Sequence, residues 1–215
     1  MTDTADAKQL LRAQLRARLA TVTPELAAAW SEQACQRIES APAFGAARAV
    51  MLFVPMSARA EVDLRPLATR ARHAGKTIAL PRVDWQSRTL SPRIVRDLAD
   101  DLEPDTAARG AAAGLLHPRE RCPAINPANL ELVLVPGLGF DSEGGRIGHG
   151  AGFYDRFLAH PALRAAAWGV GFECQVLPAA GRLPREPHDR SLDALVTESR
   201  LMMFGSGQAE PRGGG

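Results

Sequence analysis

The chain has 215 residues, of which 46% are apolar and 23% are charged, and its formal net charge is +2. A chain of this length buries roughly 70% of the surface that it exposes when unfolded, which suits one sizeable domain. The nearly balanced charge argues against a polybasic nucleic-acid or membrane binder. No apolar run approaches the roughly 18 residues of a membrane span, and the amino terminus lacks the apolar core of a signal peptide.

Two helices are predicted at the start of the chain. Residues 6–20 place leucines on one helical stripe and a basic ridge with Lys8 and Arg12, four residues apart, on another. The second helix has Pro24 in its first turn, where proline is favoured, and extends to about residue 40.

The next segments predict a strand–helix–strand unit. Residues 48–54 are typical of a buried strand, residues 62–75 of a helix that ends at a glycine, and residues 76–81 of a second strand. Short connections between them indicate a right-handed parallel unit. Residues 88–95 predict a further strand, whereas residues 104–129 have no clean period and are expected to form loops and short pieces.

The second half of the chain predicts three more strands and a helix. ELVLV at residues 131–135 is a fully apolar run that suits a central parallel strand. A helix is expected over residues 152–160, and strands over 166–172 and 192–197. The fold class is therefore α/β: a three-layer, mostly parallel open sheet with helices on both faces and a Rossmann-like topology.

This pattern predicts a single α/β domain over residues 1–204. Residues 205–215 carry five glycines and almost nothing to bury, so we expect a disordered glycine-rich tail. In open α/β sheets, ligands bind beyond the carboxyl ends of the strands. That rule predicts that residues 55–61, 81–82 and 173–175 lie close in space to a glycine-rich loop that follows residue 135.

The three cysteines are Cys35, Cys122 and Cys174, which are far apart and form no CxxC pair. An odd number without such spacing supports neither a disulfide framework nor a thiolate zinc site. We therefore expect a cytoplasmic protein.

A glycine-rich loop dominates the sequence. Residues 136–158, PGLGFDSEGGRIGHGAGFYDRFL, hold seven of the chain's 19 glycines. A strand, a glycine-rich loop and a helix form the context in which backbone amides cradle phosphate. The loop matches neither common nucleotide fingerprint. A P-loop needs a lysine after its glycines, and this chain has Arg146 there. The dinucleotide fingerprint GxGxxG needs a third glycine, and this chain has Ser142 at that position. Tight turns and crowded packing also recruit glycine, so anion binding and a structural turn both stay open.

The side chains of the loop favour anion binding. Arg146 supplies a guanidinium, and Asp155 suits either the first turn of a helix or a hard cation. Phe153 and Phe157, four residues apart, leave Tyr154 and Asp155 on a different side of the helix. Such residues are more often core anchors than ligand platforms, and we expect this role chiefly for Phe157.

Other polar residues have two interpretations each. Lys8 and Lys76 are the only lysines among 26 basic residues, which suits either contacts with phosphate or ordinary surface positions. His188 and Asp189 fit a site or a polar surface turn. His149 fits a loop contact better than a metal site, because no second histidine has a matching spacing. The absence of a GxSxG motif argues against an α/β-hydrolase.

The segment LVLVPGLGFDSEGGRIGHGAGFYDRFL closely resembles the signature of the 5-formyltetrahydrofolate cyclo-ligase family, whose members are also called 5,10-methenyltetrahydrofolate synthetases. KQLLR, EVDL, GKTIALPRV and LPREPHDRSLDALVTE agree with it in order and spacing, so the resemblance extends along nearly the whole chain before the tail. It implies an enzyme that uses ATP and Mg²⁺ to cyclise 5-formyltetrahydrofolate to 5,10-methenyltetrahydrofolate. In this reaction the formyl oxygen is phosphorylated, and ADP and phosphate are released.

The resemblance also implies roles for residues by position. It implies ATP binding by Lys8, Arg12, Arg146, Ile147, Gly148, His149, Gly150, Ala151, Gly152, Phe153 and Tyr154. It implies folate binding by Val54, Glu61, His149, Gly150, Ala151, Gly152 and Phe153. Arg146 and Tyr154 are the expected catalytic residues, and Asp155 and Asp189 the expected metal-associated ones. Lys76 and Arg82 lie in a matching segment and are assigned only a contact with phosphate or with the glutamate tail.

The loop departs from the family pattern at three positions. Many members have Tyr or Arg at the position of His149, Gly or Lys at that of Ala151, and some have Tyr at that of Phe153. Because alanine narrows the backbone freedom that glycine allows, we expect an altered pose of the loop at residue 151.

We expect ATP and 5-formyltetrahydrofolate as substrates, no nucleic-acid or membrane partner, and a monomer, with a weak dimer as the alternative. A second hypothesis is a binding module that holds a folate or a nucleotide, or serves as an RNA-associated relative, without turnover. Near-neutral charge and few aromatic residues argue against the RNA version. A sugar-phosphate isomerase or an acyl-transfer protein is permitted by fold analogy alone.

Overall fold

The computed structural model describes residues 4–56, 60–109, 114–179, 181–184 and 190–204. The tail predicted over residues 205–215 lies outside these ranges, as do His188 and Asp189. No helix in the described ranges is long and apolar enough to cross a membrane.

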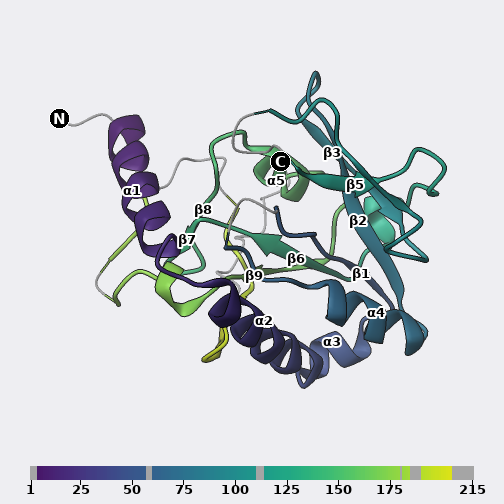
Figure 1. The fold of residues 1–215 in the computed structure, drawn as a ribbon, viewed down its shortest axis with the longest axis horizontal. Coiled ribbons are helices and arrows are strands. Elements are labelled where there is room, and N and C mark those ends of the chain that lie inside the picture. The colour runs from purple at the N-terminus through teal and green to yellow at the C-terminus, as the bar shows by residue number, and fades with distance from the viewer. Residues whose placement is uncertain (1–3, 57–59, 110–113, 180, 185–189, 205–215) are drawn as a thin grey trace, which may run out of the picture.

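A seven-stranded sheet forms the centre of the molecule (Figure 1), with the strand order β11-β10-β9-β6-β1-β2-β3. The central strands β10, β9, β6, β1 and β2 are parallel, whereas the edge strands β11 and β3 run antiparallel to their neighbours. The predicted mostly parallel sheet is thus confirmed. The strands are β1 Ala49–Met51, β2 Thr77–Asp84, β3 Thr89–Ile94, β6 Leu132–Pro136, β9 Ala166–Val170, β10 Ala194–Val196 and β11 Leu201–Met203.

Helices cover both faces of this sheet, as predicted. Figure 1 shows α2, α3 and α4 on one side and α5 on the other. The α5 side carries a helix of only six residues, so the chain segments around Leu130 and Leu163 complete that core layer. The helices are α1 Thr4–Leu19, α2 Pro24–Glu39, α3 Pro42–Ala46, α4 Arg65–His73 and α5 Phe153–Leu158.

The two core layers follow from the alternation of side chains along each strand. In β6, Leu132 and Leu134 join the cluster that packs under α2 and α4, whereas Val133 and Val135 join the cluster around α5. Because both faces are covered, this strand is apolar without interruption, which confirms the prediction of a central parallel strand.

The chain reverses its direction of travel across the sheet between β1 and β6. From β1 it proceeds to β2 and β3, and from β6 it proceeds the other way to β9, β10 and β11. Such a switch point opens a crevice beyond the carboxyl ends of the two strands. Ligand binding is therefore expected in the loops that follow β1 and β6.

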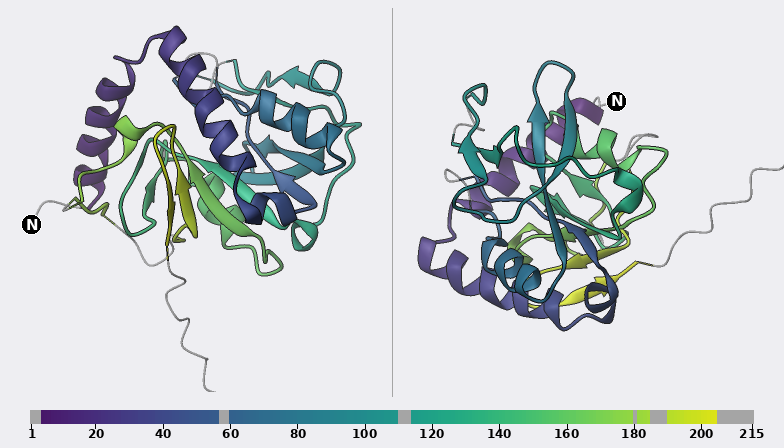
Figure 2. Two further views of the ribbon diagram at one scale, coloured as in Figure 1. Left: turned by 90° about the horizontal axis from the view of Figure 1, so that it is seen from below. Right: turned by 90° about the vertical axis from the view of Figure 1, so that its right-hand side faces the viewer.

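Several elements differ from their predicted bounds. The strand predicted over residues 48–54 ends at Met51. The segment predicted over residues 104–129 as loops and short pieces contains β5 (Leu116–Pro118), which pairs antiparallel with β4 (Leu102–Pro104). The glycine-rich loop begins with a hairpin, formed by β7 (Gly139–Phe140) and β8 (Arg146–Ile147). Figure 2 shows α1 along one edge of the molecule, beside the segment that contains η3 (Glu173–Gln175).

Candidate active site

A pocket of about 420 Å³ lies at the switch point, within the size range of small-molecule sites. Its walls come from the segments that follow β1 and β6, from the second half of β2, from the segment leading into β5, and from α1 and α5. Every predicted site residue that the structure describes lines this pocket: Lys8, Arg12, Val54, Glu61 and residues 146–155. Asp189 lies outside the described residues.

The first half of the glycine-rich loop is a rigid turn held by Asp141. This carboxylate is only 1% exposed. Its Oδ1 accepts hydrogen bonds from the backbone N–H groups of Gly145 (2.6 Å) and Glu143 (3.0 Å), and its Oδ2 accepts one from that of Leu183 (3.1 Å). Of the two alternatives for the glycines, the structural turn therefore applies to this half of the loop.

The glycines divide into two groups along the loop. A Cβ at Gly145 would lie 2.3 Å from Asp141 Oδ2, so this glycine is required by packing. Gly148, Gly150 and Gly152 line the pocket instead, and the last two have left-handed φ angles of 108° and 68°. Only the second half of the loop presents its backbone to a ligand.

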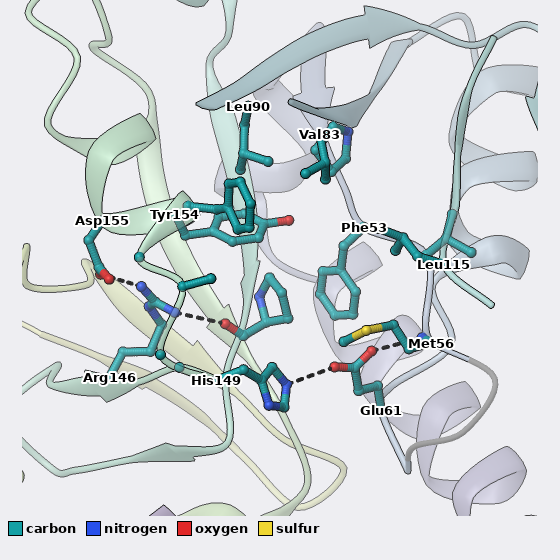
Figure 3. A pocket seen from close by; sticks show the side chains of 18 of the residues that line it. Phe53, Met56, Glu61, Val83, Leu90, Leu115, Arg146, His149, Tyr154 and Asp155 are labelled. Carbon is teal, nitrogen blue, oxygen red and sulfur yellow. Dashed lines mark hydrogen bonds and ion pairs between the residues drawn. The ribbon is translucent and has the colours of Figure 1, made fainter. Parts of the chain in front are cut away.

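Arg146 is buried at the junction of the two halves, with 5% of its side chain exposed. Its Nη1 donates to the carbonyl of Pro136 (3.3 Å), and its Nη2 donates to Asp155 Oδ1 (Figure 3). Its guanidinium carbon lies 5.9 Å from the centre of the Tyr154 ring. These contacts hold a permanent positive charge against one wall of the pocket.

The hydroxyl of Tyr154 is buried and has no hydrogen-bond partner among the described residues. Burial raises the pKa of Tyr154, and the positive charge of Arg146 only partly opposes this. The hydroxyl therefore stays protonated and can act as a donor. An unsatisfied buried donor in a pocket is the arrangement expected where a ligand supplies the acceptor.

Helix α1 brings two further cations to the loop. Arg12 Nε donates to the carbonyl of Gly148 (3.0 Å), and Lys8 lines the pocket one helical turn earlier. A Cβ at Gly150 would lie 3.8 Å from the guanidinium carbon of Arg12. The predicted basic pair thus lies over the pocket-lining glycines, where positive side chains and backbone donors favour phosphate.

The opposite wall is mostly apolar and contains one carboxylate. Phe53, Met56 and Leu115 face Arg146 and Tyr154 across the pocket in Figure 3. Glu61 is 7% exposed, and its Oε2 accepts a hydrogen bond from the Met56 backbone N–H (2.9 Å). Its Oε1 lies 3.3 Å from His149 Nε2.

Sequence reasoning missed the wall that contains Trp85. This indole donates through Nε1 to Asp105 Oδ2 (2.7 Å), and its ring centre lies 5.2 Å from that of Phe153 in an edge-to-face arrangement. Phe153 lines the pocket, whereas Phe157 is in the core as predicted. The only signal in the sequence was a large aromatic residue between two predicted strands.

The pocket is not lined by Lys76, by Arg82 or by residues 173–175. Lys76 Nζ donates to the carbonyls of Gly45 (2.8 Å) and Ala47 (2.6 Å), and Arg82 pairs with Glu103 and Glu120, each at 3.2 Å. Both cations pair with groups of the protein itself, and their contact with phosphate or a glutamate tail stays a prediction. Residues 173–175 do not line the pocket either, because Gln175 Nε2 donates instead to the carbonyls before β7, from behind the loop.

The described residues contain no group of three or more His, Cys, Asp or Glu side chains that could hold a metal ion. Mg²⁺ in nucleotide sites, however, keeps several waters and uses one or two carboxylates together with phosphate oxygens. Asp155 fits this role, because its carboxylate lines the pocket and is 27% exposed while one oxygen contacts Arg146.

Comparison with known proteins agrees with this geometry. The model of the 5-formyltetrahydrofolate cyclo-ligase family matches residues 4–198. The 5-formyltetrahydrofolate cyclo-ligase of Mus musculus is 27% identical, over 89% of this chain and 94% of its own length. The Escherichia coli K12 protein of the same name is 28% identical, over 87% and 98%. The NMR structure of Aquifex aeolicus 5,10-methenyltetrahydrofolate synthetase is 31% identical, with a TM-score of 0.74 over 95% of this chain and 96% of that one.

Proposed function

Because the chain belongs to the 5-formyltetrahydrofolate cyclo-ligase family, we propose that it cyclises 5-formyltetrahydrofolate to 5,10-methenyltetrahydrofolate in a reaction that consumes ATP and requires Mg²⁺. The chemical problem is a poor leaving group, since the formyl oxygen must be expelled when the ring closes. Transfer of the γ-phosphoryl group to that oxygen makes an imino-phosphate. The neighbouring secondary amine then attacks the activated formyl carbon, and phosphate departs.

The observation that carries this proposal is the division of one pocket into two chemically different sides. One side has Lys8, Arg12 and Arg146 around glycine backbone, which suits a triphosphate, and the other has an apolar wall with the carboxylate of Glu61. The segment over residues 146–155 lies between the two sides. A phosphoryl transfer needs both substrates at one place, because most of its catalysis is positioning and charge stabilisation.

On the phosphate side, we assign ATP binding to Lys8, Arg12 and the loop over residues 146–154. Arg146 and Tyr154 are assigned the catalytic roles. A buried guanidinium and a buried hydroxyl donor, both already oriented, stabilise the charge that develops on the transferred phosphoryl group.

On the folate side, we assign Glu61 to hydrogen bonds from ring N–H donors, because an ionised carboxylate only accepts. Phe53, Met56 and Leu115 provide apolar surface for the flat ring system. Val54 and the backbone of residues 149–153, which line the same cavity, complete the contacts assigned to the folate.

The metal is assigned to Asp155, with Asp189 as a second carboxylate outside the described residues. Mg²⁺ bound to the phosphates supplies neutralisation of their negative charge. Asp155 also orients Arg146 through their ion pair, so it acts on the same phosphate region in two ways.

The three cysteines are free, which supports our proposal of a reducing, cytoplasmic location. We further propose a single folded domain over residues 1–204 that acts as a monomer.

The proposal is tested by absorbance. Purified protein mixed with 5-formyltetrahydrofolate should produce the near-ultraviolet band of the methenyl product only when both ATP and Mg²⁺ are present. An Arg146→Ala variant should lose this turnover while it keeps the wild-type circular dichroism spectrum. Tight folate binding in calorimetry without any ADP formation would overturn the proposal and favour a binding module.

A further inference from the structure

Both carboxylate oxygens of Glu61 are occupied by the protein itself. Oε2 accepts from the Met56 backbone N–H (2.9 Å), and Oε1 lies within hydrogen-bond distance of His149 Nε2 (3.3 Å). The first contact comes from the same chain segment and orients the carboxylate. The second comes from the opposite side of the pocket, and it uses the oxygen that a ligand in the pocket would need.

This second contact ties together two segments that are 88 residues apart in the sequence. Figure 3 shows His149 reaching from the glycine-rich loop across to Glu61. His149 stands between Gly148 and Gly150, and Gly150 has a left-handed φ of 108°. Glycine on both sides gives the backbone at His149 freedom to change conformation.

We propose that His149 is a latch on the folate site: its imidazole occupies the position on Glu61 that a ring N–H donor of the substrate must take. This inference rests on the proposed function, since it assumes that Glu61 receives the folate ring. Folate binding breaks the contact between His149 and Glu61 and frees the loop segment that lines the phosphate side of the pocket. His149 therefore lowers the affinity for folate rather than raising it.

The charges around His149 make the latch dependent on pH. The charged and titratable groups that line the pocket with His149 are Glu61 after β1, Arg146 in the loop, Tyr154 and Asp155 on α5, Lys8 and Arg12 on α1, and Arg109. Glu61 is the carboxylate in contact with His149, whereas Asp155 pairs with Arg146. A protonated imidazole forms an ion pair with Glu61, whereas a neutral imidazole forms only a hydrogen bond. The latch is therefore tighter when the imidazole is protonated.

The latch also couples the two substrates. The carbonyl of Gly148, the residue before His149, accepts a hydrogen bond from Arg12 on α1. When folate releases His149 from Glu61, the loop that binds phosphate is held by one contact fewer. Because coupling between two sites is reciprocal, each substrate should increase the affinity of the other in the wild-type protein.

The test compares His149→Leu, which cannot contact Glu61, with His149→Gln, which keeps an uncharged donor. His160→Gln is the matched control, because His160 is exposed and does not line the pocket. Direct binding of 5-formyltetrahydrofolate is measured by tryptophan fluorescence between about pH 5.5 and 8, without ATP, so the readout does not depend on turnover.

The latch predicts that His149→Leu binds folate about two- to tenfold more tightly than wild type, the range expected for one modest hydrogen bond. Its affinity should not change between about pH 5.5 and 8, and neither should that of His149→Gln. Wild type and His160→Gln should both bind more weakly as the pH falls. The synergy between ATP and folate should disappear in His149→Leu.

Weaker or unchanged folate binding by His149→Leu would overturn the latch, because His149 would then be a substrate contact or a bystander. A pH dependence that persists in His149→Gln would overturn it as well. If wild type binds folate with the predicted pH dependence but forms no methenyl product with ATP and Mg²⁺, the proposed reaction fails while the latch stands.

Discussion

Leu15 on α1 packs directly against Gly139 on β7, so closely that a Cβ at Gly139 would lie 2.5 Å from Leu15 Cδ1. Leu15 is fully buried, and it is one of two core residues that α1 contributes. The same helix carries Lys8 and Arg12 to the pocket. The fit between a leucine and a glycine therefore positions two of the cations assigned to phosphate.

Replacement of Gly139 by alanine should displace α1. We expect a loss of about 1–3 kcal/mol in the free energy of unfolding, as is typical of overpacked cores, together with a raised KM for ATP. Urea denaturation and steady-state kinetics measure the two effects. Gly45→Ala is the control, because Gly45 lies in α3 with no atom within 4 Å of an added Cβ, and alanine favours a helix. Equal stability of the two variants would show that Leu15 leaves room for a side chain at residue 139.

Asp141 should be essential for the stability of the loop. Asp141→Ala removes the acceptor for three backbone N–H groups, two of them buried, and should cost about 2–4 kcal/mol in chemical denaturation. Asp141→Asn, which keeps one acceptor oxygen, should lose less. The control is Asp84→Ala. Asp84 is exposed and accepts two similar hydrogen bonds from backbone N–H groups, so its replacement should cost little stability. A similar loss at both positions would contradict the role given to burial.

Tyr154 should remain protonated through its ordinary pKa of about 10, because burial favours the neutral hydroxyl and so raises the pKa. It is the only tyrosine in the chain, so tyrosinate absorbance reports on it alone. The native protein should titrate at higher pH than the urea-unfolded protein. A native titration near pH 10 would show that the hydroxyl is solvated.

Removal of this hydroxyl should separate function from stability. Tyr154→Phe should unfold at a urea concentration no lower than wild type, because it deletes a buried donor that has no partner among the described residues. Turnover should fall by about 10²-fold or more, as for the loss of a preorganised donor. A stable variant with full activity would remove Tyr154 from catalysis.

The cysteines should react slowly in the native protein. Burial raises the pKa of Cys35 to about 12 and also raises those of Cys122 and Cys174, so little thiolate forms near pH 8. A chromogenic disulfide reagent should modify the half-buried Cys174 first and reach three thiols only after denaturation. Rapid modification of Cys35 would indicate that its site opens readily.

The parts of the fold that were predictable have strong local patterns. Helix α2 begins at Pro24 and β6 is an unbroken apolar run, so each is specified by residues close together in the sequence. α3 and β11 have five and three residues, too few for a period to develop, and both were missed. The β7–β8 hairpin was missed because Asp141 holds it through backbone contacts that no side-chain pattern reveals.

The candidate site shows the same division. The residues assigned to phosphate lie in one linear segment and one helical ridge, whose composition indicates their chemistry. The wall with Trp85 and Leu115 is built from apolar residues of separate strands and loops, and such residues look the same in a sequence whether they line a pocket or fill a core.

The sequence by itself determined the α/β class, the central strand and the glycine-rich loop with its arginine, tyrosine and aspartate, because these depend on local order. The tertiary structure decided which glycines are packed and which face the pocket, that Lys76 and Arg82 are used internally, and that His149 contacts Glu61. The physical reason is that such contacts join residues far apart in the chain. Only the order of the strands in the sheet brings the segments after β1 and β6 together at one switch point.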